Sequence, residues 1–296
     1  MIRLRHVKHP VRSGKGLLAR VRARLCSTRL RLYRYFAMRP FRKIKRGRRD
    51  LCWCGGRLLP FKWHSSYGIC DSCGCYVNMR PPAQESLEQL YSLGLYWVTQ
   101  QRLKGYPTIG ERAALYVSDG RVDQWLKFIR DYGPPTGCAL EVGCAPGVLL
   151  EELRKRGYEC VGVEISHSVA DWTRRTTALD VRSGFFPGVD VPSCDLFLAF
   201  DVLEHSPCPV EFMREAHNRL RPGGIAIIQT GIDRYDYEPP FGQRFDIFDD
   251  LEHLFLFTDK SMAELASRVG LEIISNKERI WLAGEVCIFT KPEGGF

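Results

Sequence analysis

The stretch A-L-E-V-G-C-A-P-G-V-L-L-E-E-L, residues 139–153, decides how this chain folds. It starts as an apolar run with one acid, Glu141, passes through a turn of small residues at 143–147, and continues in a helical pattern. This order predicts a strand, a tight turn and a helix, because glycine permits backbone conformations and close approaches that a side chain would block. A ligand can then lie against the free N–H groups at the start of the helix.

A second apolar run, residues 160–163, ends at Glu164, 21 positions after Gly143. A carboxylate at the end of a second strand is placed to accept hydrogen bonds from both hydroxyls of a ribose. A glycine-rich turn alone is equally typical of an ordinary strand-to-helix connection, but the added acid favours a doubly wound fold that binds a nucleoside.

Four segments together resemble the class I S-adenosylmethionine-dependent methyltransferases, in the subgroup that includes sugar and quinone methyltransferases. They are E-V-G-C-A-P-G (141–147), G-V-E-I-S (162–166), F-D-V-L-E-H (200–205) and L-R-P-G-G (220–224). The resemblance covers about residues 135–292. It implies an α/β fold with a Rossmann-like, doubly wound, seven-stranded sheet and S-adenosylmethionine as the methyl donor.

Two positions depart from the family pattern. Ala145 stands where the family usually has glycine, which is a mild change. In S-G-F-F-P (183–187), Phe185 stands where the family often has an aspartate that reaches the adenine amino group. We therefore expect apolar contact and backbone groups to hold the adenine.

The resemblance also implies which residues bind the donor. The turn at 143–147 is expected to pack against the methionine portion, Glu164 to bind the ribose, and Asp201 to lie beside the donor at the acceptor mouth. A helix N-cap is the alternative role for Asp201. The implied cofactor-binding residues are Glu141, Gly143, Cys144, Ala145, Gly147, Glu164, Ile165 and Asp201.

Two Glu–His pairs are candidates for removing the acceptor proton. Glu204–His205 belongs to the family motif and has a structural role as its alternative. Glu252–His253 lies in F-D-I-F-D-D-L-E-H-L-F-L-F-T (245–258), which resembles the acid–His segment that serves proton removal in sugar C-methyltransferases. We expect His253 to be the base and Glu252 to orient it, because a neighbouring carboxylate raises imidazole basicity. A hydrogen-bonded core histidine is the alternative.

Residues 232–244, I-D-R-Y-D-Y-E-P-P-F-G-Q-R, mix aromatic and charged side chains near the expected active mouth. We expect them to form the acceptor pocket, with Tyr235, Tyr237 and Arg244 contacting a polar or anionic acceptor. A plain surface loop is the alternative.

Five of the twelve cysteines fall between residues 52 and 75, as C-W-C (52–54) and C-D-S-C-G-C (70–75). Paired cysteines on two tight turns predict a structural zinc site, because zinc prefers four thiolates in a tetrahedron. The predicted ligands are Cys52, Cys54, Cys70 and Cys73. The first pair is one residue short of the usual spacing, so Cys75 or His64 is a possible substitute ligand.

Unligated thiols are the alternative, but a unit of about 30 residues cannot build enough core to fold without such a staple. Sugar methyltransferases of the subgroup often carry an N-terminal zinc module, which implies the same module here.

The order of these features predicts four parts: a basic arm (1–50), a zinc-binding module (51–82), a helical linker or lid (83–135) and a methyltransferase domain (136–296). Helices are predicted at 84–104, 122–132, 147–156, 168–179, 209–220 and 259–269. Strands are predicted near 138–142, 159–164, 181–183, 195–200, 226–230, 271–277 and 285–290.

The charge is unevenly spread along the chain, which carries a net charge of +9. Residues 1–50 hold 18 Lys and Arg and one acid, whereas the remainder carries a net charge of −8. The arm is interpretable as a disordered tail, an amphipathic helix on an anionic membrane surface, a nucleic-acid contact or an organelle transit peptide.

No apolar run approaches about 20 residues, and scattered thiols suit a reducing compartment. We expect a cytoplasmic protein without a secretory signal, able to contact the inner membrane face.

These features together predict methyl transfer from S-adenosylmethionine to a small molecule or glycan, with a nucleotide- or lipid-linked sugar as the best fit. The alternatives are a quinone-like O-methyltransferase and an RNA-binding zinc protein with an RNA-directed methyltransferase domain. Gly143, Gly147 and Glu164 speak against a scaffold that has lost donor binding.

Overall fold

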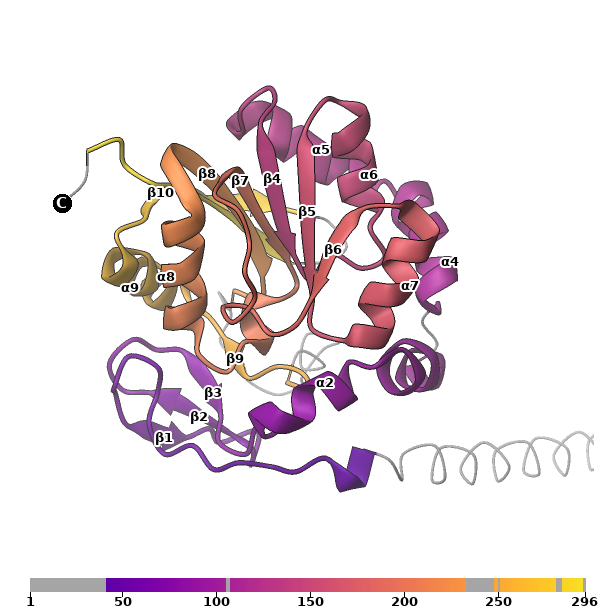
Figure 1. Ribbon diagram of the computed structural model, residues 1–296. Coiled ribbons are helices and arrows are strands. Elements are labelled where there is room, and N and C mark those ends of the chain that lie inside the picture. Colours follow the sequence, from indigo (N-terminus) through magenta and orange to yellow (C-terminus); the bar gives the residue numbers. More distant parts are fainter. Residues whose placement is uncertain (1–40, 105–106, 233–247, 250, 281–283, 295–296) are drawn as a thin grey trace, which may run out of the picture. The chain divides into compact units, whose positions relative to one another are not determined.

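A computed structural model describes residues 41–104, 107–232, 248–249, 251–280 and 284–294 (Figure 1). The chain divides into two compact units, residues 1–43 and 44–296. In the first unit the described part is one short 3₁₀-helix, η1 (Phe41–Lys43). Everything below concerns the second unit.

The second unit is built on a mixed seven-stranded sheet with the order β10-β11-β8-β7-β4-β5-β6. Five strands from β8 to β6 run parallel, and β11 pairs antiparallel with both β8 and β10. This confirms the predicted Rossmann-like α/β fold. The strands are β4 (Cys138–Val142), β5 (Glu159–Glu164), β6 (Asp180–Ser183), β7 (Cys194–Phe200), β8 (Leu220–Thr230), β10 (Glu272–Arg279) and β11 (Glu285–Thr290).

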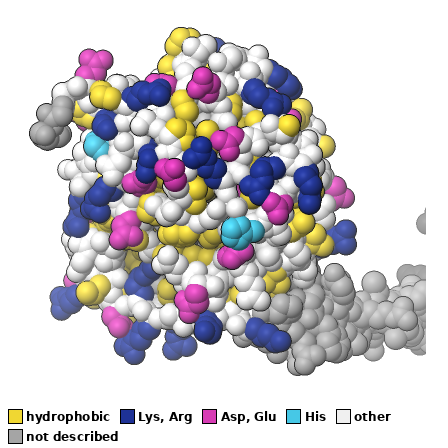
Figure 2. All heavy atoms as spheres, in the orientation of Figure 1, with side chains coloured by type: hydrophobic (Ala, Val, Ile, Leu, Met, Phe, Trp, Pro, Cys, Tyr) yellow, Lys and Arg dark blue, Asp and Glu magenta, His cyan; other side chains and the backbone are white. Residues whose placement is uncertain are grey.

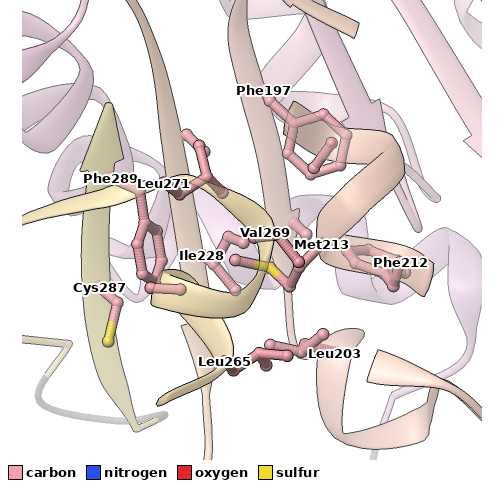
Figure 3. Close-up of a cluster of buried hydrophobic side chains, with 14 of the residues drawn as sticks. Phe197, Leu203, Phe212, Met213, Ile228, Leu265, Val269, Leu271, Cys287 and Phe289 are labelled. Atoms are coloured by element: carbon pink, nitrogen blue, oxygen red, sulfur yellow. The ribbon is translucent and has the colours of Figure 1, made fainter. Parts of the chain in front are cut away.

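Helices cover both faces of this sheet because the strands are apolar on both sides. On one face, α8 (Pro209–Arg219) and α9 (Asp259–Val269) pack Met213 and Leu265 into a cluster with Ile228 and Phe289 of the strands (Figure 3). On the other face lie α5 (Arg121–Tyr132) and α6 (Val148–Lys155). The helix α7 (His167–Thr177) packs beside β5 and β6.

Local signals explain why these predicted elements formed. In α5 the buried side chains recur at helical spacing, at Val122, Trp125 and Ile129, which gives the helix one apolar face. The helix α9 begins at Thr258, whose hydroxyl accepts a hydrogen bond from the N–H of Ser261, and ends at Gly270 in the left-handed conformation. The predicted span 259–269 is therefore confirmed to the residue.

The segment 84–104, predicted as one helix, is divided into several shorter helices, and a further helix that was not predicted follows it. These helices are η2 (Gln84–Ser86), α2 (Leu87–Leu90), a π-helix η3 (Leu93–Gln100), α3 (Gln101–Lys104) and α4 (Ile109–Ser118). Ser92 ends the first part because its hydroxyl caps the next helix, accepting from Leu95 N at 3.3 Å. The helix α4 starts with a capping box, in which Glu111 accepts from the N–H of Thr108 at 2.8 Å.

The cysteine module, residues 51–82, forms a small antiparallel sheet of its own. Its strands are β1 (Leu58–Pro60), β2 (Tyr67–Cys70) and β3 (Tyr76–Asn78). A fourth strand, β9 (Phe255–Leu256), comes from the segment after β8 and pairs with β3. The module is therefore completed by residues that are distant in sequence.

On the face shown in Figure 2, basic and acidic side chains are interspersed rather than separated by sign. Pairs such as Lys155–Glu152, at 2.7 Å, are largely exposed, so each contributes little to stability. Among the helices of the described ranges, none combines the length and apolarity needed to cross a bilayer.

Candidate active site

A cavity of about 650 Å³ opens where β4, β5 and β7 end. Carboxyl ends of parallel strands are where ligands bind in open α/β sheets. The cavity wall includes all the predicted donor-site residues except Gly147, and both members of the predicted catalytic pair: Glu141, Gly143, Cys144, Ala145, Glu164, Ile165, Asp201, Glu252 and His253. The structure therefore brings these predicted site residues to one place.

The turn between β4 and α6 requires glycine at two positions. Gly143 has φ +74°, and a Cβ there would lie 2.4 Å from Cγ2 of Val202. Gly147 has φ +90° and precedes the first residue of α6. The N–H of Gly143 donates to Val163 O at 2.8 Å. The turn is thus held against β5, and residues 143–146 line the cavity.

Glu164 ends β5 and is buried against the cavity wall. Burial raises the pKa of its carboxyl to about 7, although hydrogen bonds from the N–H groups of Ser166 and Ile165 oppose the shift. The Ser166 bond measures 3.0 Å to Oε1. A carboxyl group that changes charge near neutrality therefore stands where a ribose is expected.

Glu141 is the second-to-last residue of the neighbouring strand β4, and burial raises the pKa of its carboxyl well above the usual value. Its Oε2 is buried, and within the described part of the chain no group donates a hydrogen bond to it. A buried acceptor without a partner is costly, so a ligand with a donor group, such as an ammonium, fits this corner.

Asp201 follows β7 with φ +55°, a left-handed conformation that is uncommon outside glycine. The side-chain amide of Gln229 donates to its Oδ1 at 2.6 Å, while Trp125 Nε1 donates to Gln229 Oε1 at 3.0 Å. Burial, and then the charge of Glu204, raises the pKa of Asp201 to about 6. The short helix η4 (Leu203–His205) has Val202 as its N-cap, so Asp201 does not take the alternative capping role.

The wall expected to hold the adenine contains Ile165, Gly184 and Phe185. Phe186 next to it packs on Phe212 of α8, with ring centroids 5.0 Å apart. The position at which the family often has an aspartate thus carries an aromatic ring in the cavity wall.

Arg112 of α4 reaches the same cavity and was not predicted from the sequence. Its guanidinium lies 5.0 Å from the ring of Trp97, and Nη1 donates to Tyr116 OH at 3.3 Å. Its Nε is a buried donor without an acceptor among the residues described. The capping-box pattern at residues 108–111 would have predicted this helix and drawn attention to its arginine.

The two Glu–His pairs meet in the cavity. Ligand atoms of Glu204, His205 and His253 lie within 4.8 Å of one another, and the two imidazole centroids are 5.1 Å apart. His205 Nδ1 lies 2.6 Å from the carbonyl oxygen of Glu252, so Nδ1 is the protonated nitrogen because a carbonyl only accepts. Thr230 donates to Glu204 Oε2 at 2.8 Å.

The side chain of Glu252 contacts the predicted linker segment, residues 83–135. Its carboxylate accepts hydrogen bonds from the side chain of Gln100 and from Tyr96 OH, the latter at 3.3 Å. The sequence predicted Glu252 as the carboxylate that orients His253. In the structure the buried carboxylate clustered with His253 is that of Glu204, from the family motif.

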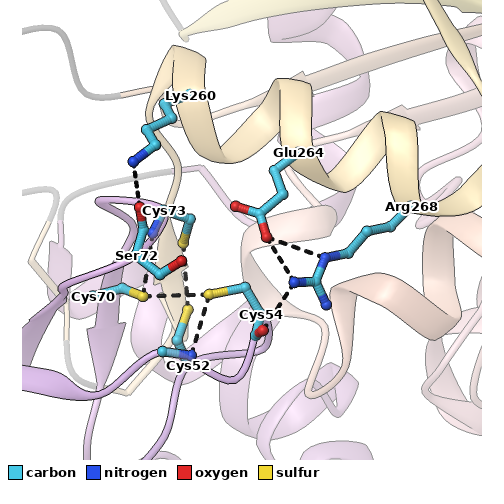
Figure 4. A network of polar contacts seen from close by, with 9 residues as sticks. Cys52, Cys54, Cys70, Ser72, Cys73, Lys260, Glu264 and Arg268 are labelled. Atoms are coloured by element: carbon cyan, nitrogen blue, oxygen red, sulfur yellow. Dashed lines mark hydrogen bonds and ion pairs between the residues drawn. The ribbon is translucent and has the colours of Figure 1, made fainter.

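The four predicted metal ligands also come together (Figure 4). Their sulfurs lie within 4.8 Å of one another, with 3.6 Å between Cys52 and Cys73 and 3.3 Å between Cys54 and Cys70. Sulfurs bound to one zinc ion at about 2.3 Å lie less than about 4.6 Å apart. The Cys52–Cys73 and Cys54–Cys70 separations both meet this limit.

The two proposed substitute ligands have other contacts. Cys75 Sγ donates to the carbonyl of Leu256 at 3.2 Å, and His64 packs its ring against Tyr67 and Phe248. Neither Cys75 nor His64 is part of the group of four residues that could hold a metal ion.

Cationic side chains surround this thiol cluster, as Figure 4 shows for two of them. Arg268 donates to the carbonyl of Cys54 at 2.9 Å, and Lys260 donates to that of Ser72. Arg49 lies over the ring of Phe255, 4.5 Å from its centroid. Burial lowers the pKa of Arg49, and the negative potential of Cys52, Cys208 and Cys75 opposes the shift.

Three predicted acceptor residues, Tyr235, Tyr237 and Arg244, lie outside the described residues, as does most of the basic arm. Their predicted roles stay predictions.

A family profile described as a methyltransferase domain matches residues 115–276, which is more than half of the chain. A ubiquinone biosynthesis O-methyltransferase from Ruegeria pomeroyi is 28% identical over 115 residues, 35% of this chain and 46% of that protein. One from Alkalilimnicola ehrlichii is 27% identical over 99 residues, 31% of this chain and 40% of that protein. The chain thus spans less than half the length of these relatives.

A solved structure, that of the mitomycin 7-O-methyltransferase MmcR, superposes with a TM-score of 0.51 at 15% identity, over 71% of this chain and 63% of that one. This likeness shows the fold.

Proposed function

The chain belongs to the methyltransferase domain family and is an S-adenosylmethionine-dependent methyltransferase, and from this we propose that it methylates a hydroxyl-bearing small molecule or glycan, best a nucleotide- or lipid-linked sugar. The observation that carries the proposal is the cluster of Glu204, His205 and His253 in the wall of the same cavity as the glycine turn and Glu164. Proton-accepting groups therefore face the place where a donor would bind.

The residues present fit the donor. Glu164 would accept hydrogen bonds from the ribose hydroxyls, and the buried Oε2 of Glu141 would accept from the ammonium group. Arg112 would pair with the carboxylate, and Phe185 would cover the adenine. When bound, S-adenosylmethionine supplies an electrophilic methyl group. This chain's residues hold it in line with the acceptor, and such alignment can lower a barrier by several kcal/mol.

His253 would take the proton from the acceptor hydroxyl, with Glu204 beside it to stabilise the imidazolium. Burial raises the pKa of the Glu204 carboxyl, and the positive form of His253 opposes that shift. An imidazolium at His253 would therefore favour the carboxylate form of Glu204. General-base catalysis contributes typically 10²–10⁴-fold. His205, with its Nδ1 protonated, presents Nε2 as a second acceptor in the same cluster.

The cavity also carries polar groups suited to a hydroxylated acceptor. Tyr91 OH and Ser206 Oγ line it and are buried without hydrogen-bond partners in the described part of the chain. A sugar hydroxyl would satisfy both. A quinone-like phenol is the second candidate, supported by the ubiquinone biosynthesis O-methyltransferases among the relatives and by the aromatic wall of Tyr91, Tyr96 and Trp97.

We further propose that Cys52, Cys54, Cys70 and Cys73 hold one structural zinc ion. Support comes from the four clustered sulfurs, and from Arg268 and Lys260, which donate to main-chain carbonyls of the two cysteine turns. We also propose that the basic arm contacts an anionic membrane surface, with bulk nucleic acid as the rival partner; the support is its 18 basic residues against one acid.

The test incubates the full chain with methyl-labelled S-adenosylmethionine and three fractions of a cell extract: lipid-extracted, sugar-nucleotide and RNA. We expect label in one of the first two fractions, and a loss of at least about 100-fold in the His253→Ala variant. Label confined to RNA would overturn the acceptor class. Full turnover in His253→Ala would overturn the assigned base.

A further inference from the structure

We propose that the cysteine module, residues 51–82, is part of the catalytic apparatus, because Tyr67 acts as a positioning residue for His253. The inference rests on the proposed role of His253 as the base. It goes beyond a folding role for the thiol cluster, since it assigns the module an effect on the cavity.

The first link is the shared sheet. In the β3–β9 pair, Tyr76 lies opposite Leu256 and Val77 opposite Phe255. The strand β9 therefore starts two residues after His253. The module is hydrogen-bonded directly to the segment that delivers the histidine to the cavity.

The second link is the main chain of His253 itself. Tyr67 OH lies 2.6 Å from the carbonyl oxygen of His253 and 3.1 Å from that of Asp249. A phenol has one hydrogen, so the two carbonyls share it, and the shorter bond is to His253. Asn78 adds its side-chain amide to the same His253 carbonyl at 3.4 Å, and its backbone N–H to Leu254 O at 2.9 Å.

The third link is the strand that carries Tyr67. The four-residue strand β2 starts at Tyr67 and ends at Cys70, one of the four clustered thiols. Tyr67 is fully buried, and its ring packs against Phe248 with centroids 5.1 Å apart. Closing the thiol cluster therefore fixes one end of the strand whose other end holds the His253 backbone.

A displacement of His253 matters because catalytic geometry is exacting. A shift of about 1 Å in a reacting group can cost about 100-fold in rate. The two imidazoles of the cluster are near neighbours, so moving one changes its relation to the other.

The test measures the reactivity of individual histidines, which needs no acceptor. Each variant is treated with diethyl pyrocarbonate, and peptide mass spectrometry gives the modification rate of His253 relative to the exposed His167. The variant is Tyr67→Phe, which removes one hydroxyl and keeps the ring. The matched control is Lys260→Gln, which removes another hydrogen bond between the module and the body, that to Ser72 O.

We expect Tyr67→Phe to change the relative rate of His253 by at least about threefold, and Lys260→Gln to leave it unchanged. Tyr67→Phe is expected to unfold at a lower temperature, because it removes a buried donor from two carbonyls, but still in one cooperative transition. The affinity for S-adenosylmethionine is expected to match that of the parent protein in both variants, which separates a local displacement from general loosening. Asn78→Ala is a second variant on the same carbonyl and should act in the same direction.

An unchanged His253 rate in folded Tyr67→Phe and Asn78→Ala would overturn the proposal. So would an equal change in Lys260→Gln. The proposed function fails by different results, whatever the modification rates are: label confined to RNA overturns the acceptor class, and full turnover in His253→Ala overturns the assigned base.

Discussion

At the scale of single residues, the cavity concentrates carboxyl groups whose ionisation is tied to burial. Glu164 and Asp201 have pKa values raised to about 7 and about 6, and burial is the largest cause in both. Carboxyl groups with perturbed pKa values are common at functional sites, because burial and neighbouring charges there adjust the pKa to the task of the group. Charge in the donor site is therefore sensitive to pH close to neutrality.

Donor affinity should rise with pH. A carboxylate accepts from two ribose hydroxyls, whereas a protonated carboxyl accepts less well, so below pH 7 Glu164 must release a proton on binding. We expect the dissociation constant for S-adenosylmethionine to rise by up to about tenfold per unit as pH falls below 7, and to level off above it. Calorimetry in two buffers with different ionisation enthalpies measures the proton release.

The raised pKa of Glu164 affects the stability of the ligand-free protein in the opposite direction: its contribution to the unfolding free energy should fall as pH rises toward 7. Between its ordinary pKa and about 7, the native Glu164 holds a proton that the unfolded chain has lost, so this group favours folding at the lower pH. Glu164→Gln should flatten both pH dependences, with Glu159→Gln, at the exposed start of the same strand, as the control. A pH dependence of binding that persists in Glu164→Gln would contradict the assignment.

At the scale of elements, the turn between β4 and α6 depends on glycine for both conformation and space. Gly143→Ala would place a Cβ against Val202 at a positive φ. We expect this variant to lose donor binding and at least about 1–2 kcal/mol of unfolding free energy. Gly110→Ala, in the first turn of α4 with open space around it, should be neutral or gain about 0.5 kcal/mol. Denaturant unfolding and calorimetry compare the two, and equal effects would refute the steric argument.

The elements that could be predicted are those whose signals are local. The strands β4 and β5 are marked by their own apolar runs. The ends of the helix α9 are marked by the capping residues next to them. The helix α4 was missed although its capping box is also local. Predicting one helix over 84–104 failed because Ser92 competes for the backbone and restarts the helix.

Contacts between distant segments have no such local signal. Glu204 and His253 are 49 positions apart, and no periodicity in either segment reports that they meet. The same holds for the pairing of β3 with β9. The sequence therefore predicted Glu252 and His253 as residues of the candidate site, but it carried no signal that Glu204 lies beside His253.

At the scale of the whole molecule, the thiol cluster should act as a structural cross-link. A chelator under reducing conditions should release about one zinc per chain and lower the midpoint of thermal unfolding. Cys73→Ser should bind less zinc and lower the same midpoint. Cys160→Ser, at a thiol of β5 outside the cluster, is the control. Metal content well below one per chain, with cooperative unfolding unchanged by the chelator, would contradict the zinc assignment.

The pairing of β3 with β9 also sets an order of events during synthesis. Val77 meets Phe255 only after the ribosome has made the whole parallel part of the large sheet. The nascent cysteine-rich segment therefore waits with one edge of its sheet unpaired while most of the chain emerges. Chaperones that shield such edges, and the supply of metal to the nascent thiols, would then influence the yield of protein whose cavity is correctly assembled.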